Sequence, residues 1–128
     1  MTPKRRDEIE SLLRAIISGE VPLTELIGYG IELSRLENGY KLQSNLPSSL
    51  IFPSRSDVLR GLWRYEGDSE LLKEWSFYIL SETAIDLDDL DRDELGKELV
   101  EALWTISETG EVPINLLDEA RFRLFENT

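Results

Sequence analysis

The 128-residue chain contains neither cysteine nor histidine. Without cysteine it can form no disulfide and no zinc or iron–sulfur site with thiolate ligands. Without histidine it lacks the Ser-His-Asp triad, the Cys-His pair, histidine-ligated metals and the usual change of side-chain charge near neutral pH. Most familiar catalytic and metal-binding arrangements are therefore excluded. The sequence predicts a protein that is not an enzyme and that holds no metal and no cofactor.

The chain also lacks a long apolar run. No stretch approaches the ~18 apolar residues that span a bilayer, and Met1 is followed by a charged segment in place of the apolar core of a signal peptide. We therefore expect a soluble, cytoplasmic protein that does not enter a membrane, and the absence of cysteine fits a reducing compartment. Apolar side chains make up 41% of the chain, which is enough for one domain over residues 1–128 with its own core.

Positive charge is scarce, and the shortage is confined to the second half of the chain. The net charge is −12. Residues 1–64 hold nine basic and eight acidic side chains, whereas residues 65–128 hold five basic and eighteen acidic ones. Such a surface repels phosphate backbones, which argues against nucleic-acid binding, and it attracts basic proteins. Acidic charge also keeps proteins soluble, so a solvated surface and a recognition surface both stay open as interpretations.

Apolar residues recur at helical spacing over most of the chain. This spacing predicts helices over 3–18, 22–37, 55–66, 69–83, 92–108 and 113–126. Thr2, Ser54 or Ser56, and Asp68 stand where a side chain caps the first turn of a helix. The fold class is therefore all-α, with five or six mostly antiparallel helices in one compact domain. We expect Leu95 and Ile114 among the residues of its core.

Two stretches weaken the helical pattern. The helix over 22–37 contains Gly28 and Gly30, each of which costs on the order of 1 kcal/mol relative to alanine, and Asn38-Gly39 ends it. Residues 38–53 are irregular, with an apolar segment at 50–52 that we expect to plug into the core, a short strand being the alternative. Residues 84–91 read as an acidic connector anchored by inward-facing apolar residues.

Eight carboxylates cluster between the connector and the fifth helix, and we call them the acidic tract: Asp86, Asp88, Asp89, Asp91, Asp93, Glu94, Glu98 and Glu101. A calcium loop needs oxygen ligands at fixed offsets, a central glycine and a glutamate at its twelfth position. Counted from Asp89, the sixth residue is Glu94 and the twelfth is Val100; counted from Asp86, the fifth is Leu90. The tract therefore predicts no dedicated metal site, and only weak, nonspecific binding of divalent cations stays open.

Part of this tract has a local role, because Asp91, Asp93 and Glu94 lie at the start of the helix over 92–108, where negative charge complements the helix dipole. Glu94, Glu98 and Glu101 then share one face of that helix, where like charges repel one another. A basic partner would remove this repulsion. Trp104 lies at the edge of the apolar stripe and is the aromatic residue expected to be partly exposed. We therefore take the acidic tract and Trp104 as candidate partner-binding residues.

A resemblance to a known family rests on the segment 71–80 (LLKEWSFYIL), the acidic connector and the segment 99–104 (LVEALW). Over residues 68–106 the chain resembles small acidic bacterial immunity proteins of toxin–immunity systems, including helical colicin-type ones. The resemblance implies a bacterial inhibitor that binds a cognate toxin, often a basic nuclease, through an acidic surface. Its motifs are mostly core positions, so no toxin-contacting residue carries over. The alternative is a homodimeric structural or regulatory helical protein without a toxin partner, in which acidity serves solubility.

Overall fold

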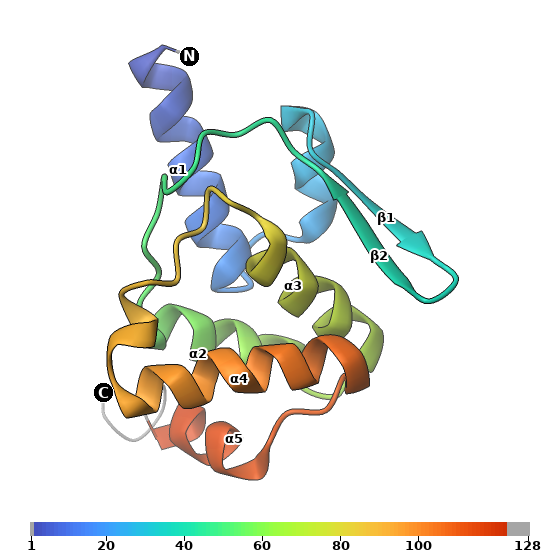
Figure 1. Cartoon of the computed structure of the whole chain (residues 1–128), viewed down its shortest axis with the longest axis vertical. Helices are drawn as coiled ribbons and strands as arrows, with labels where there is room; N and C mark the ends of the chain where they lie inside the picture. Colours follow the sequence, from blue (N-terminus) through green and yellow to red (C-terminus); the bar gives the residue numbers. More distant parts are fainter. Residues whose placement is uncertain (1, 123–128) are drawn as a thin grey trace.

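The computed structural model describes residues 2–122 and is built mainly from helices, with one hairpin projecting from the body (Figure 1). Its α-helices are α1 (Pro3–Ile17), α2 (Arg55–Tyr65), α3 (Ser69–Ser81), α4 (Glu94–Thr109) and α5 (Ile114–Arg121). The 3-10 helices η1 (Leu23–Tyr29) and η2 (Leu90–Arg92) and the strands β1 (Glu32–Leu36) and β2 (Gly39–Gln43) complete the described part. The broadly all-α class is confirmed. No described helix combines the length and the apolar character needed to cross a membrane.

Three of the helices begin where the sequence places a capping side chain. In each case an oxygen of Thr2, Ser54 or Asp68 accepts a hydrogen bond from the backbone N–H three residues further on, at 3.2 Å. Ser54 is thus the cap of α2, and the alternative, Ser56, is not. Asp57 also accepts a hydrogen bond from the N–H of Ser54, which completes a capping box. Each such cap contributes about 1 kcal/mol, so the helix starts are encoded locally.

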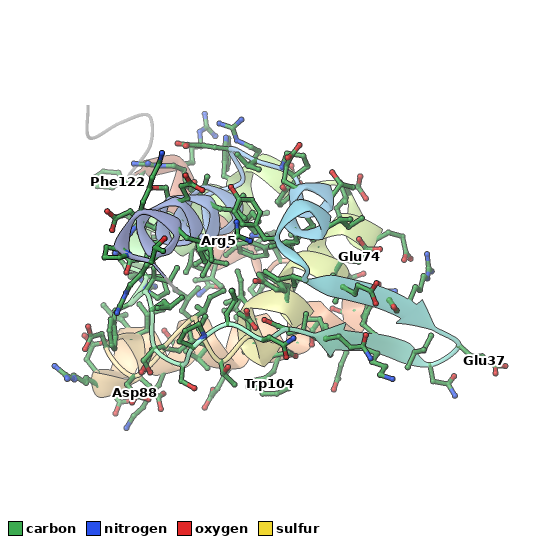
Figure 2. All side chains as sticks on the ribbon, turned by 90° about the horizontal axis from the view of Figure 1, so that it is seen from above. Arg5, Glu37, Glu74, Asp88, Trp104 and Phe122 are labelled. Atoms are coloured by element: carbon green, nitrogen blue, oxygen red, sulfur yellow. The ribbon has the colours of Figure 1, made fainter. Side chains whose placement is uncertain are left out.

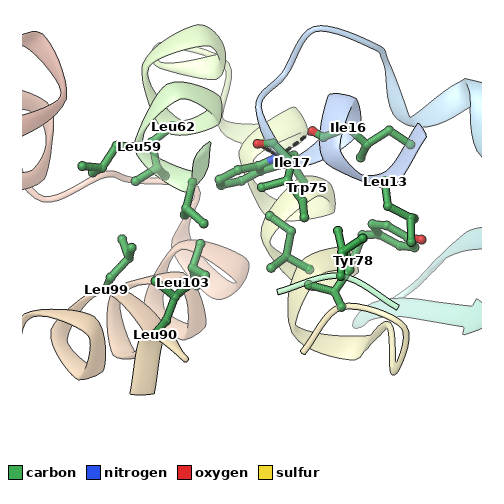
Figure 3. Close-up of a cluster of buried hydrophobic side chains, with 14 of the residues drawn as sticks. Leu13, Ile16, Ile17, Leu59, Leu62, Trp75, Tyr78, Leu90, Leu99 and Leu103 are labelled. Atoms are coloured by element: carbon green, nitrogen blue, oxygen red, sulfur yellow. Dashed lines mark hydrogen bonds between the residues drawn. The ribbon is translucent and has the colours of Figure 1, made fainter. Parts of the chain in front are cut away.

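Helix α3 is the central element of the core, and it carries Trp75 and Tyr78, the largest fully buried side chains (Figure 3). The indole N–H of Trp75 donates to the backbone carbonyl oxygens of Ile16 and Ile17, at 3.1 and 3.2 Å. These carbonyls stand in the last turn of α1, where helical partners run out. Helix α4 packs along α3, and α5 packs on α2. A single apolar cluster therefore joins all five α-helices.

Residues 22–43 do not form the predicted helix over 22–37. Only η1 is helical there, and Gly30 closes it in the left-handed region, at φ 76°. The chain then makes an antiparallel hairpin in which Leu33 pairs with Leu42. The helix prediction was wrong because apolar and polar residues alternate on both sides of Asn38-Gly39, which is the pattern of a hairpin. Strand β2 consequently lies inside the stretch predicted to be irregular.

The predicted plug is formed by Leu50 and Ile51, which are both buried, whereas Phe52 is 45% exposed. Ile51 forms a parallel bridge with Ile85, so the plug docks against the acidic connector. The alternative, a short strand, is represented only by this single bridge. The last residues of the predicted helix over 113–126 lie outside the described range. This docking holds the connector in place and thereby orients the start of the acidic tract.

Candidate functional site

The first carboxylate of the acidic tract, Asp86, is used by the fold itself. The hydroxyl of Ser49 donates to one of its oxygens at 2.5 Å, and the backbone N–H of Asp88 donates to the other at 2.9 Å. These donors, Ser49 above all, hold the pKa of Asp86 below its usual value. Asp86 therefore ties the connector to the segment that carries the plug. Of the candidate partner-binding residues, it is one whose oxygens are already engaged.

Asp93 is the second carboxylate with a structural role. Its Oδ1 accepts a hydrogen bond from the backbone N–H of Gly96 at 2.7 Å and so caps α4. Gly96 is buried against the backbone carbonyl of Leu90, and a side chain at this position would overlap that oxygen. The dipole role predicted for Asp93 is thus realised as a direct cap. This cap fixes where α4 begins.

The remaining carboxylates of the tract are exposed, and we call them the acidic face: Asp88, Asp89, Asp91, Glu94, Glu98 and Glu101. Asp89 forms an exposed ion pair with Arg92, at 3.2 Å. The other five form no ion pair with any residue in the range 2–122, and neither does Lys97, which lies among them. The acidic face therefore runs from the end of the connector through η2 to the exposed side of α4, with only partial compensation by the described cations.

Helix α4 extends this side beyond the predicted residues. Glu108 is exposed and stands seven residues after Glu101, which is two turns further along the same face. It was missed because the tract was drawn around closely spaced carboxylates. Helical spacing from Glu94 through Glu101 is the signal that identifies it.

One largely buried cation lies near the start of α4. Arg55 is 14% exposed and donates to both carboxylate oxygens of Glu119, each at 2.6 Å, and to the backbone carbonyl of Leu95 at 2.5 Å. The bond to Glu119 is the main cause that raises the pKa of Arg55, and the charges of Glu98 and Asp93 contribute less. Arg55 is therefore neutralised by Glu119, and the acidic face keeps its negative charge.

Three large apolar side chains lie exposed around this face. Trp104 is 58% exposed, so its expected partial exposure is confirmed. Figure 2 shows Trp104 and Asp88 along one edge of the molecule, across from α1, which carries Arg5. Leu95 and Ile114, expected in the core, are instead 57% and 75% exposed. Leu95 stands in the first turn of α4 and Ile114 in the first turn of α5.

An open hollow of about 240 Å³ lies between α4 and α5. Glu98 and Glu101 supply carboxylates to its lining, and Ala102 and Leu116 supply apolar surface. Long basic side chains have an aliphatic stem and a charged end. The lining of this hollow matches both parts, so it can accommodate a lysine or arginine side chain.

The acidic tract is not arranged as a metal site. Among residues 2–122 no three acidic side chains converge in a way that could hold a metal ion. Comparisons with protein-family models, with curated proteins and with solved structures found no match. What the chain binds is therefore inferred from the chemistry of its own surface.

Proposed function

We propose that the chain is an acidic protein-binding module that acts as an immunity-type inhibitor and neutralises a basic toxin or enzyme. The observation that supports this best is the acidic face, with five exposed carboxylates outside any ion pair with a described residue. Carboxylates three and four residues apart on a helix repel one another. A cationic surface relieves this repulsion when it docks, and its approach is accelerated by the negative potential.

Trp104 supplies the anchor of the proposed interface. Tryptophan is enriched among the few residues that carry most of the binding energy of an interface, and such residues are ringed by polar contacts that exclude water. Trp104 is 58% exposed on α4, one turn beyond Glu101, so it offers a large apolar side chain beside a carboxylate. In this proposal the carboxylates govern encounter and orientation, and Trp104 governs the lifetime of the complex.

The positive charge of the partner explains how binding of this chain would inhibit it. An enzyme that acts on nucleic acid binds phosphates with a cationic surface. A protein that covers this surface with carboxylates competes with the substrate directly. The hollow between α4 and α5 would take one arginine or lysine of that surface, with its charge against Glu98 and Glu101. The resemblance of residues 68–106 to immunity proteins supports the same role.

Co-expression with the proteins encoded beside its gene tests the proposal. A basic protein that co-purifies, and whose toxicity falls when this chain is present, supports it. The variant Glu98→Lys/Glu101→Lys is expected to lose at least about tenfold in affinity. Glu32→Lys/Glu37→Lys is the matched control, because it makes the same charge change on the hairpin, where Figure 2 places Glu37 far from Asp88. Equal affinity of both variants and the wild type would overturn the proposed interface.

The exposed apolar side chains also favour a second candidate, a homodimer without a toxin partner. Such a dimer would bury Leu95, Trp104 and Ile114 between two copies. Light scattering over a dilution series separates the two proposals. A dimer that persists on dilution supports the homodimer, whereas a monomer that binds a basic partner supports the inhibitor. The apolar residues of α3 do not favour a dimer, because they lie in the core of the single chain.

A further inference from the structure

A second hollow, of about 300 Å³, lies between the end of α3 and β2 and shares no lining residue with the acidic face. Glu82, at its base, is only 3% exposed. The hydroxyl of Ser44, just after β2, donates to Oε1 of Glu82 at 2.6 Å. Tyr40 and Phe77 line the hollow with their rings, whose centroids are 5.5 Å apart and whose planes are tilted by 38°. The hollow therefore combines a buried carboxylate with aromatic surface.

This carboxylate is buried without a cation. No lysine or arginine in the range 2–122 forms an ion pair with Glu82. Burial raises the pKa of Glu82, and the hydroxyls of Ser44 and Tyr78 counter this only in part. A buried carboxylate is costly unless it is both hydrogen-bonded and paired with positive charge. Glu82 is hydrogen-bonded, but no described lysine or arginine pairs with its charge.

A further polar group lies beside it. The hydroxyl of Tyr78 is fully buried next to Glu82, yet it makes no hydrogen bond of good geometry with any described residue. The contact between this hydroxyl and the carboxylate of Glu82 is one of the causes that lower the pKa of Glu82. A carboxylate accepts about four hydrogen bonds, so Glu82 keeps acceptor capacity beyond its contacts with Ser44 and Tyr78.

We propose that this hollow binds an organic cation, an alkylammonium or guanidinium group, with its charge at Glu82 and its body against the rings of Tyr40 and Phe77. Aromatic faces attract cations, and a carboxylate nearby adds to this attraction. Lys41 also lines the hollow, but its side chain is exposed and forms no ion pair in the described part of the chain. The positive charge of Lys41 opposes a cationic ligand. The cation is either a free amine or the side chain of a lysine or arginine in another protein.

Titration of the protein with n-butylammonium, followed by NMR near neutral pH, tests this site. We expect saturable changes in the backbone resonances of Tyr40, Ser44 and Glu82, and none with n-butanol, which has a similar body without the charge. Glu82→Gln is expected to weaken binding at least about tenfold, because a neutral amide oxygen replaces the charged carboxylate as the acceptor. Lys41→Gln is the matched control and is expected to bind more tightly.

A readout on the wild-type protein alone guards against misfolding of a variant. The pKa of Glu82, followed through its carboxyl carbon, is expected to fall as n-butylammonium is added, because the cation binds the ionised form. Saturable changes confined to the acidic face, equal binding of n-butanol, or full affinity of Glu82→Gln would each overturn the site. The peptide acetyl-Gly-Lys-Gly-amide identifies the source: tighter binding than n-butylammonium assigns the site to a protein side chain, and weaker binding assigns it to a free amine.

Discussion

Arg55 and Glu119 form a two-point ion pair with both nitrogen–oxygen distances at 2.6 Å, and they join α2 to α5 across 64 positions of the chain. Arg55 also donates to the carbonyl of Leu95, so one guanidinium holds three helices together. Because Leu95 stands in the first turn of α4, this contact sets how the helix that carries the acidic face meets the rest of the fold.

Loss of this ion pair is expected to destabilise the protein. Arg55→Ala removes both bonds to Glu119, whose side chain is 27% exposed, and the bond to the carbonyl of Leu95, and we expect a loss of about 2 kcal/mol in the free energy of unfolding. Arg92→Ala breaks the pair with Asp89, where both side chains are at least half exposed, and we expect less than about 0.5 kcal/mol. Urea unfolding measures both. Equal losses of stability in the two variants would show that the pair of Arg55 and Glu119 contributes no more than an exposed ion pair.

Gly61 is where α2 approaches its neighbours most closely. A side chain here would overlap the backbone carbonyl of Ile17 and the ring of Trp75, so Gly61→Ala is expected to cost about 3 kcal/mol. Gly28 has no atom near the place of a new side chain, and Gly28→Ala is expected to be neutral or to stabilise by up to about 1 kcal/mol. Thermal unfolding compares the two, and a Gly61→Ala variant as stable as the wild type would contradict this packing.

Two tryptophans are expected to differ sharply in their roles. Trp75→Phe removes the donor to the carbonyls of Ile16 and Ile17 and leaves a small cavity, so we expect a loss of about 2–3 kcal/mol. Trp104→Ala is expected to change stability by less than about 0.5 kcal/mol, because the side chain is already exposed. It is instead expected to weaken binding of the basic partner at least about tenfold. Chemical unfolding and calorimetric titration separate the two effects.

Two carboxylates give opposite dependences of stability on pH. Burial raises the pKa of Glu82, so the folded state binds this proton more tightly than the unfolded chain does. Relative to Glu82→Gln, the wild type is therefore expected to lose stability as the pH rises from about 3 to about 7. Urea midpoints measured over this range test the direction, and a parallel pH profile for the variant would contradict a perturbed Glu82.

Asp86 is expected to behave in the opposite way. Its hydrogen bonds lower its pKa, so the stability it provides is present above the pKa of the unfolded chain and is lost as the pH falls through that of the folded state. Relative to Asp86→Asn, the wild type is expected to gain stability between about pH 3 and about pH 7. The same urea series measures it, and a loss of relative stability would show that Ser49 does not favour the ionised form.

The helix starts were predictable because their signals are local. Thr2, Ser54 and Asp68 act within three residues, and the apolar spacing of α3 marks the helix that became central. The hairpin was missed because the apolar residues of 22–31 fit a helical face, and this pattern was extended past Gly30. The alternation around Asn38-Gly39 was the competing signal, and it prevails in the structure.

The candidate site was predicted only in part, because the sequence shows helical spacing but not contacts between residues that are far apart in the chain. Exposure of Glu98, Glu101 and Trp104 follows from helical spacing, which the sequence displays directly. The partner of Asp86 lies 37 residues away and that of Arg55 lies 64 residues away, so neither contact leaves a pattern in the sequence. Glu82 reads as one more acidic residue in the last turn of the helix predicted over 69–83, and only the placement of β2 beside α3 reveals that it is buried.

The association rate with the basic partner, measured against salt concentration, tests the central claim most directly. If the carboxylates of α4 receive a cationic surface, the rate constant of the wild type falls steeply between about 20 and about 500 mM salt. Glu98→Lys/Glu101→Lys then associates more slowly and with a flatter salt dependence, while Glu32→Lys/Glu37→Lys follows the wild type. The same rate and the same salt dependence for all three proteins would contradict the claim.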